Sequence, residues 1–332
     1  MLKVVVIGVG SMGQNHVRLC SESANLVGVM DLDGKKAQTI SKKYNVKPYS
    51  KLDDLLSSDI DAVIVATPTF THYEIGKKAI QQGKHLLIEK PMCEKVENAI
   101  ELYNLAKDRG TTLAVGHVER HNPVVRFAKD IVEKKKYGGL ISQAATRVSS
   151  LPPRIKDVGV ILDLGIHDID IMRYLASSEV ERVFAYASKE NTSAAFEDRA
   201  NILMRFKDGS CGYIEANWLT QSKIRTLKLT LEKVVAELNY TDQAVQIYSS
   251  ELKKYDESDL SPAKMPWQYS TQNIMLKKEE PLKNELVDFF SAIEQKRKPL
   301  VTGYDGIKTL QIAQAAAQSY KTNKEVELEN EL

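Results

Sequence analysis

Cysteine is scarce in this chain, which limits both its architecture and its compartment. Three cysteines, Cys20, Cys93 and Cys211, are spread over 332 residues, and none stands in a Cys-x-x-Cys pair. An odd, widely spaced set excludes a disulfide framework, so we expect a reducing compartment, the cytoplasm. The first residues run directly into a short apolar stretch, which is typical of a buried strand and not of a signal peptide.

Long hydrophobic runs and an excess of one charge are also missing. No apolar run approaches the roughly 20 residues that cross a bilayer. The formal net charge is only +2, which provides no basis for binding nucleic acid or a membrane surface. We therefore expect a globular protein of about two domains with small-molecule partners, and no nucleic-acid or membrane partner.

The first 120 or so residues alternate between two patterns. Apolar, often β-branched runs predict buried strands at Leu2–Ile7, Leu26–Met30, Ala62–Ala66, His85–Ile88 and Leu113–Val115. Helical patterns separate them at Ser11–Ser21, Gly34–Tyr44, Lys51–Leu56, Thr71–Gln82 and Glu94–Arg109. The alternation indicates βαβ units and a parallel, doubly wound α/β sheet.

After Pro123 the pattern changes to strands joined by hairpin signals. Expected strands are Leu140–Val148, Val180–Ala187, Arg199–Phe206, Gly212–Trp218, Ile224–Leu231, Val234–Asn239 and Ala244–Tyr248. Expected helices are Val124–Lys135, Asp163–Leu175, Leu282–Gln295 and Tyr304–Ser319, and the polar residues 251–280 predict a long loop. This half is predicted to be an α+β domain with a mostly antiparallel open sheet.

A glycine-rich turn stands near the start, in the stretch VVVIGVGSMGQNH, between an expected strand and an expected helix. In its Gly-x-Gly-x-x-Gly pattern, Gly8 makes the tight turn, Gly10 admits a pyrophosphate, and Gly13 lets the helix pack on the strand. The N–H groups at the helix start, near Ser11 and Met12, favour an anion. Alone, the motif also fits a purely structural turn.

An acidic residue downstream supports dinucleotide binding. Asp31 ends the next strand 18 residues after Gly13, close to the spacing of a ribose-binding acid. Its carboxylate can accept hydrogen bonds from both ribose hydroxyls and would repel a 2′-phosphate, so the expected cofactor is NAD. Residues 1–120 are therefore predicted to form a dinucleotide-binding domain, followed by a second domain over residues 121–332.

Nicotinamide chemistry also needs a base and a group that steadies a developing alkoxide. Lys90 follows a strand in the stretch IEKP, and ligands of open α/β sheets bind outside the carboxyl ends of strands. Asp163 and His167, in LDLGIHDID, are four residues apart and hence neighbours on one helix face. A surface lysine and an ordinary ion pair are the competing interpretations.

Together these motifs resemble the glucose–fructose oxidoreductase / inositol dehydrogenase / MocA family over essentially the whole chain. Besides the glycine loop, the resemblance is carried by ATPTFTH (66–72), EKP (89–91) and Asp163-x-x-x-His167. It implies a Rossmann domain, then an α+β domain, residues 121–332, that binds substrate and whose open sheet often forms oligomer contacts. It also implies a cleft for NAD and a polyol or sugar. A homodimer or homotetramer is expected.

The resemblance also implies residue roles. His167 is the expected general base, Lys90 the cation at the reacting oxygen, and Asp163 the group that orients substrate and base. Glu89 is expected near the nicotinamide ribose, and Thr67 with His72 near the cofactor. The Lys90–Pro91 bond is often cis in the family.

The stretch GHVERHNP, residues 116–123, resembles the GHxERFNP stretch of the family's nucleotide-sugar 3-dehydrogenases. The resemblance implies oxidation of a sugar C3 hydroxyl, most specifically that of UDP-N-acetylglucosamine, to a keto sugar for a downstream aminotransferase. Glu119, Arg120 and Asn122 are then expected to border the sugar pocket. In this chain His121 stands in place of the phenylalanine, so the resemblance does not specify which residue forms that wall of the pocket.

A metal site is the competing interpretation of this stretch, because strand alternation or a helix would place His117 and His121 on one side with Glu119. No further cysteine or carboxylate follows at the usual spacing. We therefore expect no metal, a cofactor-side role for His117, and a packed or hydrogen-bonded His121.

Other functions stay open at this point. The substrate can be a free polyol or aldose, or the enzyme can retain its NAD and recycle it with a second carbonyl compound. A non-enzymatic dinucleotide sensor can use the same fold. A sensor, however, needs none of Lys90, Asp163 and His167.

Overall fold

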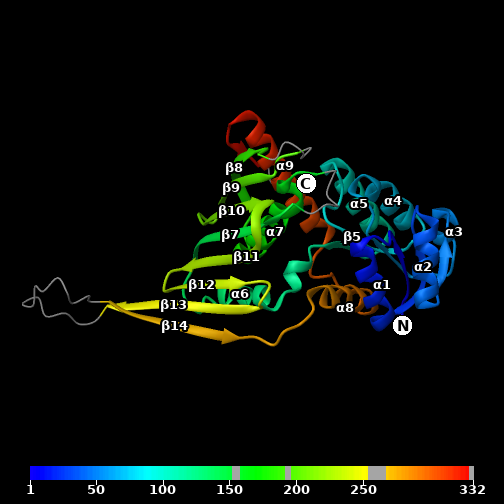
Figure 1. Cartoon of the computed structure of the whole chain (residues 1–332), viewed down its shortest axis with the longest axis horizontal. Helices are drawn as coiled ribbons and strands as arrows, with labels where there is room; N and C mark the ends of the chain where they lie inside the picture. Colours follow the sequence, from blue (N-terminus) through cyan, green and yellow to red (C-terminus); the bar gives the residue numbers. More distant parts are fainter. Residues whose placement is uncertain (152–157, 191–195, 253–266, 329–332) are drawn as a thin grey trace, which may run out of the picture. The chain divides into compact units, whose positions relative to one another are not determined.

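The computed structural model describes residues 1–151, 158–190, 196–252 and 267–328. The chain divides into two compact units: unit 1 comprises residues 1–121 and 280–311, and unit 2 comprises residues 122–279 and 312–331. Each unit has its own sheet and its own apolar core (Figure 1).

Unit 1 contains a six-stranded parallel sheet in the order β3-β2-β1-β4-β5-β6, which is the doubly wound order. Its strands are β1 (Lys3–Ile7), β2 (Asn25–Met30), β3 (Lys47–Tyr49), β4 (Ala62–Val65), β5 (His85–Glu89) and β6 (Leu113–Gly116). The strand order reverses at β1 and β4, and the crevice outside their carboxyl ends is where such sheets bind ligands.

Helices accompany this sheet, as the alternation in the sequence predicts. They are α1 (Ser11–Ser23), α2 (Gly34–Tyr44), α3 (Leu52–Leu56), α4 (His72–Gln81), α5 (Val96–Arg109) and α8 (Pro281–Glu294), with the short turns η1 (Thr69–Thr71) and η2 (Val118–His121). Gly110 ends α5 in the left-handed conformation that glycine adopts most readily. A further helix, α9 (Gly303–Thr322), starts in unit 1.

Unit 2 contains a nine-stranded sheet in the order β14-β13-β12-β11-β7-β10-β9-β8-β15. Its strands are β7 (Leu140–Ser150), β8 (Val180–Ser188), β9 (Arg199–Phe206), β10 (Cys211–Asn217), β11 (Leu219–Leu231), β12 (Val234–Asn239), β13 (Ala244–Leu252), β14 (Trp267–Met275) and β15 (Val326–Glu327). Among the described strands β7 and β10 pair in parallel and the other pairs are antiparallel. The core joins the sheet to α6 (Pro123–Glu133), α7 (Ile166–Ala176) and α9. The predicted fold class is confirmed.

The polar stretch 251–280 is a point of difference, because the sequence predicts a loop there. Strand β14 instead pairs with β13 from Met275, opposite Ala244, to Trp267, opposite Leu252. Residues 268–273 are all exposed, so this edge strand carries no apolar alternation for a sequence pattern to detect. Residues 253–266, also within the predicted loop, lie outside the described residues.

The second difference concerns the domain division. The sequence predicts one continuous second domain over 121–332, but residues 280–311 group with unit 1. The physical reason is apolar packing: Leu286 and Phe289 of α8 lie in the same buried cluster as Val4 of β1 and Val17 of α1. The sequence pattern changes from alternating strands and helices to mostly strands near residue 120. That change locates one boundary but cannot show that residues 280–311 pack in unit 1.

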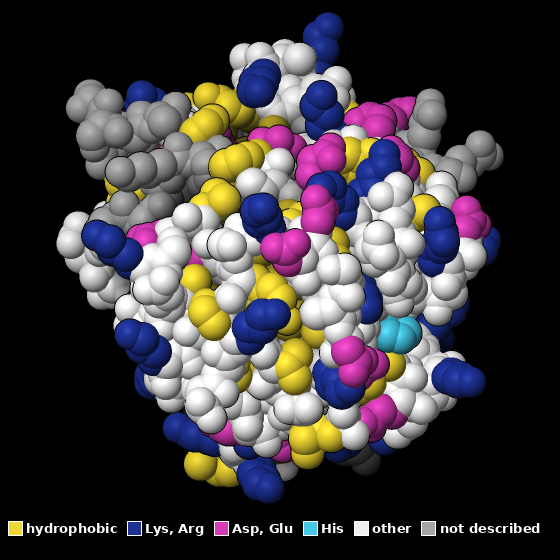
Figure 2. Space-filling view, turned by 90° about the vertical axis from the view of Figure 1, so that its right-hand side faces the viewer, with side chains coloured by type: hydrophobic (Ala, Val, Ile, Leu, Met, Phe, Trp, Pro, Cys, Tyr) yellow, Lys and Arg dark blue, Asp and Glu magenta, His cyan; other side chains and the backbone are white. Residues whose placement is uncertain are grey.

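The surface is chemically mixed on the face drawn in Figure 2. Lys and Arg side chains are interspersed with Asp and Glu side chains and with scattered apolar groups. No helix in the described ranges is long and apolar enough to cross a bilayer.

Candidate active site

The glycine loop follows β1 and leads into α1. Gly8 has a φ of +87°, and a Cβ there would lie 2.6 Å from the carbonyl oxygen of Ala66. A Cβ on Gly13 would lie 1.8 Å from the carbonyl oxygen of Gly8, so no larger residue fits at that position. A Cβ on Gly10 would meet no atom within 4 Å. The space beside Gly10 is therefore open, and α1 begins there without a side-chain cap on its N–H groups.

Asp31 stands directly after β2 and is fastened to this loop. Its carboxylate accepts hydrogen bonds from the backbone N–H of Val9 and of Asp33, both at 2.8 Å. Carboxylate oxygens have about four lone-pair sites, so two backbone donors leave acceptor capacity for a ribose. The geometry thus places a negative charge beside the glycine loop.

His72 connects two loops at the edge of the same sheet. One ring nitrogen lies 2.8 Å from the carbonyl oxygen of Thr67 and the other 3.0 Å from that of Pro91. Burial lowers the pKa of His72, although these carbonyl groups oppose the shift. Because His72 is only 1% exposed, any effect on a cofactor passes through the Thr67 loop that it holds.

Glu89 and Lys90 end β5. Glu89 is buried, and its Oε1 lies 2.8 Å from Nε2 of His16 on α1. Its Oε2 accepts a hydrogen bond of 3.2 Å from the backbone N–H of Lys90. Lys90 is half-buried, and the Lys90–Pro91 peptide bond is cis.

The stretch after β6 is tightly held. His117, Glu119, Arg120 and His121 are all buried. The Arg120 guanidinium donates to Asp305 at 3.1 Å and to the carbonyl of Leu300 at 3.3 Å.

Asn122 and Asp305 act as helix caps. Asn122 caps α6 by accepting from the N–H of Val124, and its amide donates to the carbonyl of Tyr240. Asp305 accepts from the backbone and side chain of Thr302 at the start of α9, which is a capping box. The structure thus gives Arg120 and Asn122 internal partners, and their role at a sugar stays a prediction.

Among the described residues, side chains of the types that can bind a metal ion converge at one place. The ligand atoms of His16, Glu89 and Glu285 all lie within 4.8 Å of one another. His117, Glu119 and His121 are not part of this group. Three donors fall short of the four that a closed structural zinc site uses. His16 and Glu285 were not expected from the sequence, since each comes from a different helix.

In unit 2, Asp163 and His167 stand where two helix types meet. Asp163 belongs to a π-helical turn, η3 (Ile161–Gly165), and His167 is the second residue of α7. Both side chains are partly exposed, whereas Leu164 and Ile166 between them are buried. The sequence predicts an ordinary α-helix here. The inserted π turn changes the side of the helix on which Asp163 lies relative to His167. Such turns are frequent at functional sites.

A buried ion pair fixes the start of α7. The Arg147 guanidinium on β7 donates to both carboxylate oxygens of Asp168, at 2.7 and 3.0 Å, and each side chain is 1% exposed. The same guanidinium lies 5.1 Å from the ring centre of Tyr240. Asp168 directly follows His167, so this bidentate pair in the core fixes the backbone position from which the His167 side chain extends. Sequence reasoning missed both residues.

The comparisons with known proteins match this architecture. The NAD-binding Rossmann domain of the GFO/IDH/MocA oxidoreductases matches residues 2–117, and the C-terminal domain of the same family matches residues 125–237. The chain belongs to the GFO/IDH/MocA family. Its predicted class of cofactor, NAD, is thereby confirmed.

Individual relatives of this GFO/IDH/MocA chain share about a quarter of its residues. UDP-N-acetylglucosamine 3-dehydrogenase of Acidithiobacillus ferrooxidans is 28% identical over 94% of this chain and 95% of its own. Scyllo-inositol 2-dehydrogenase (NAD(+)) of Bacillus subtilis is also 28% identical, over 99% and 96%. The solved structure of the Acidithiobacillus enzyme superposes with a TM-score of 0.86 at 26% identity, covering 97% of this chain and 98% of that one.

Replacing Asp31 with serine is expected to narrow the preference for NAD over NADP. The wild-type carboxylate would repel the 2′-phosphate, and about 1.4 kcal/mol of repulsion is a factor of ten in affinity. We expect the ratio of the two dissociation constants to shift by about tenfold, measured by titration of the reduced cofactors. Asp33→Asn is the control, since Asp33 caps α2 and should leave the ratio nearly unchanged. Equal affinity of the wild type for both cofactors would contradict the role of Asp31.

Proposed function

We propose that this family member is an NAD-dependent dehydrogenase that oxidises a sugar hydroxyl, specifically C3 of UDP-N-acetylglucosamine. The observation that carries the proposal is the stretch GHVERHNP, supported by full-length similarity to an enzyme of that activity in sequence and in structure. The product is then a 3-keto sugar, which a partner aminotransferase can convert to an amino sugar.

Each proposed catalytic residue has one task. When bound, NAD supplies the acceptor for the hydride. A ring nitrogen of His167 takes the hydroxyl proton, the Lys90 ammonium stabilises the developing negative charge on the same oxygen, and Asp163 orients the substrate and the base. Lys90 suits this task because its backbone N–H is fixed by Glu89.

The proposed cofactor-binding residues fall into groups according to the part of NAD that each group would contact. We propose that Gly8, Gly10 and Gly13 form the pyrophosphate cradle and Asp31 the ribose contact. The remaining proposed contacts are Ser11 and Met12 at the helix start, Thr67, Glu89 and His117, and His72 is proposed to position the Thr67 loop near the cofactor.

The substrate is tested with a panel of nucleotide sugars and free polyols in the presence of NAD. UDP-N-acetylglucosamine is expected to give a far higher kcat/KM than N-acetylglucosamine, because the remote nucleotide provides binding energy that positions the C3 hydroxyl. NADH formation and the product mass, two units lighter with the keto group at C3, are the readouts.

A free polyol is the second candidate, because the inositol dehydrogenase is equally identical. Myo-inositol and glucose are therefore in the panel. If either is turned over as efficiently as the nucleotide sugar, the nucleotide-sugar assignment fails while the dehydrogenase remains. NADH absorbance in the purified protein before any addition would indicate a retained, recycling cofactor.

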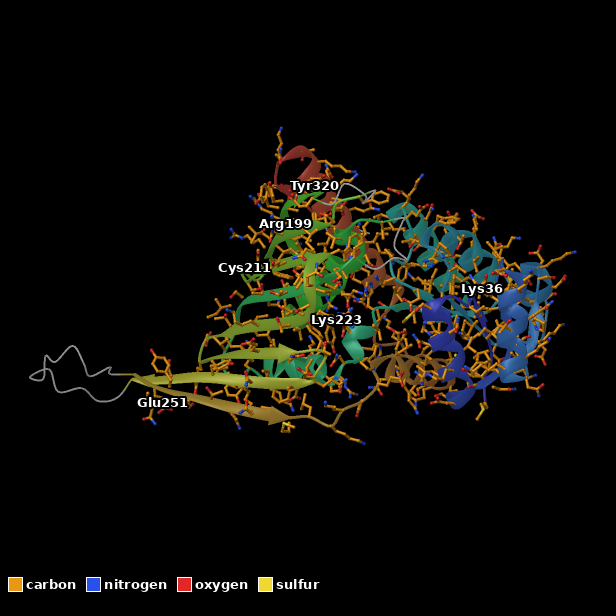
Figure 3. All side chains as sticks on the ribbon, in the orientation of Figure 1. Lys36, Arg199, Cys211, Lys223, Glu251 and Tyr320 are labelled. Atoms are coloured by element: carbon orange, nitrogen blue, oxygen red, sulfur yellow. The ribbon has the colours of Figure 1, made fainter. Side chains whose placement is uncertain are left out.

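We also propose a homo-oligomer formed through the open face of the unit 2 sheet. Phe184 pairs in register with Leu203, and Leu203 with Tyr213, so the three form one row across β8, β9 and β10. Their exposed fractions are 38%, 52% and 37%. Cys211, labelled in Figure 3, is exposed on the same face of β10 as Tyr213. A second copy can cover an identical row by two-fold symmetry.

Leu203→Glu is expected to convert the oligomer to a monomer, because it places a charge in the middle of this row. Mass by light scattering after size exclusion is the measurement. Leu32→Glu introduces the same change at a leucine that is 93% exposed in unit 1 and should leave the mass unchanged. A monomeric wild type would contradict the proposal.

A further inference from the structure

Glu285 is a buried carboxyl group without a compensating donor. It lies on α8, which packs against α1 and η2, and it is 3% exposed. Neither of its carboxylate oxygens has a hydrogen-bond partner among the described residues. An ionised carboxylate in such a place is strongly disfavoured, and native proteins rarely leave one there without a reason.

The neighbours of Glu285 add negative charge. The carboxylate of Glu89 and a ring nitrogen of His16 are within 4.8 Å of it, and Asp288 stands one turn further along α8. Burial, followed by the charges of Glu89 and Asp288, raises the pKa of Glu285 well above its usual range. Burial also opposes ionisation of Glu89, but the hydrogen bond from His16 and the charge of Lys90 outweigh it and lower the pKa of Glu89.

The other charged groups around α8 have partners of their own. On η2, Arg120 is paired with Asp305, and the backbone carbonyl of His121 accepts from Asn284. On α1, the Arg18 guanidinium lies between Glu22 and Glu280 at the surface. Glu119 and the imidazole of His121 are the remaining titratable groups of η2, and both are buried. Lys90 carries a positive charge that acts on Glu89.

We propose that Glu285 is a positioning residue that carries a proton in the folded enzyme, leaving Glu89 as the single carboxylate of the His16–Glu89–Glu285 cluster. Glu89 holds the backbone of Lys90 with one oxygen and His16 with the other. Space for this carboxylate is made by Gly116, where a Cβ would lie 2.9 Å from Glu89 Oε2. A second negative charge at Glu285 would repel Glu89 and displace Lys90. Only this consequence at Lys90 rests on the proposed function.

The sign of the effect on stability follows from linkage. A carboxyl group whose pKa is raised in the folded state does not lower the free energy of unfolding at pH values below its unfolded pKa of about 4.3. Above that pH the unfolded chain releases the proton that the folded chain must keep, so stability is lost as pH rises towards the folded pKa. Glutamine has the shape of the protonated acid and binds no proton, so it removes this loss.

The experiment compares the full-length wild type with Glu285→Gln and with Glu294→Gln, an exposed glutamate on the same helix. Melting temperatures are measured without cofactor from pH 5 to pH 9. We expect the melting temperature of Glu285→Gln to lie nearest to that of the wild type at pH 5 and to exceed it by a growing margin as pH rises towards the folded pKa, whereas Glu294→Gln follows the wild type throughout. A difference between Glu285→Gln and wild type that does not change with pH overturns the proposal.

The same proteins report the consequence at Lys90. At neutral pH, Glu285→Gln should bind NADH and turn over substrate within about twofold of the wild type, and its activity should persist to higher pH. A large loss of kcat at neutral pH in this variant overturns the positioning role. Absence of turnover in the wild type on every sugar defeats the proposed function instead, and leaves the melting series intact.

A wild-type measurement covers the case in which Glu285→Gln does not fold. Infrared spectra of the native protein should contain the carbonyl band of a buried protonated carboxylic acid at neutral pH. Its absence overturns the proposal. So does one equivalent of a tightly bound transition metal in the purified wild type, because a metal would need both carboxylates ionised.

Discussion

His167→Ala is expected to lower kcat by about 10²–10⁴, the usual contribution of a positioned acid–base. The hydroxyl proton then has no acceptor as the hydride leaves, while the dinucleotide cradle in unit 1 is untouched. NADH formation under saturating substrate gives kcat, and titration with NAD should give a dissociation constant close to that of the wild type. The limb of the pH profile that reports the free base should disappear.

Chemical rescue separates a lost base from a damaged fold. Added imidazole is small enough to enter the space that the ring leaves and should restore part of the rate in His167→Ala. An active variant with an unchanged pH profile would transfer the role of base to Lys90.

Arg147→Met is expected to cost about 3–5 kcal/mol of unfolding free energy, the loss seen when one partner of a buried ion pair is removed. The change leaves the carboxylate of Asp168 in the core, 1% exposed, without its bidentate donor. For a domain of this size that corresponds to a drop of roughly 6–20 °C in melting temperature. Because Asp168 follows His167, kcat should fall as well.

Two further variants identify the origin of the expected loss of stability in Arg147→Met. Adding Asp168→Leu to Arg147→Met removes the uncompensated charge and should recover most of the stability. Arg182→Met breaks an exposed pair with Glu325 and should leave the melting temperature unchanged. If Arg147→Met behaves like Arg182→Met, the buried pair does not hold α7.

The strands of unit 1 were predictable because they are covered on both faces. Ala62–Val65 is buried at every position, so it reads as a continuous apolar run with clear ends. Strand β3 was missed because only three residues, Lys47–Tyr49, take part and only Tyr49 is buried. Strand β14 was missed because it is held by backbone pairing with β13, while the side chains of residues 268–273 are all exposed.

The site could be predicted only where its chemistry is local in sequence. The glycine loop, Asp31 and Lys90 each stand at a strand end, so their places in the sequence indicate them as candidates, whereas Glu89 was a candidate only through the family resemblance. The Arg147–Asp168 pair and the His16–Glu89–Glu285 cluster join residues from separate elements, 21 to 269 positions apart. One weak signal existed: Arg147 shares an inward face of β7 with Gln143 and Ala145, where a charge requires a buried partner.

The return of residues 280–311 to unit 1 has a consequence for how the protein is made. A ribosome releases the strands of the dinucleotide-binding sheet first, but α8, which supplies Leu286 and Phe289 to their core, emerges only after strands β7 to β14 of unit 2. At about 5–20 residues per second, the first 121 residues wait many seconds with an uncovered apolar surface. Unit 2 can pair strands β7 to β14 during that wait, because only its edge strand β15 is made later. The last-made helices therefore close the first-made unit, and a fragment ending at residue 121 would carry an exposed apolar face.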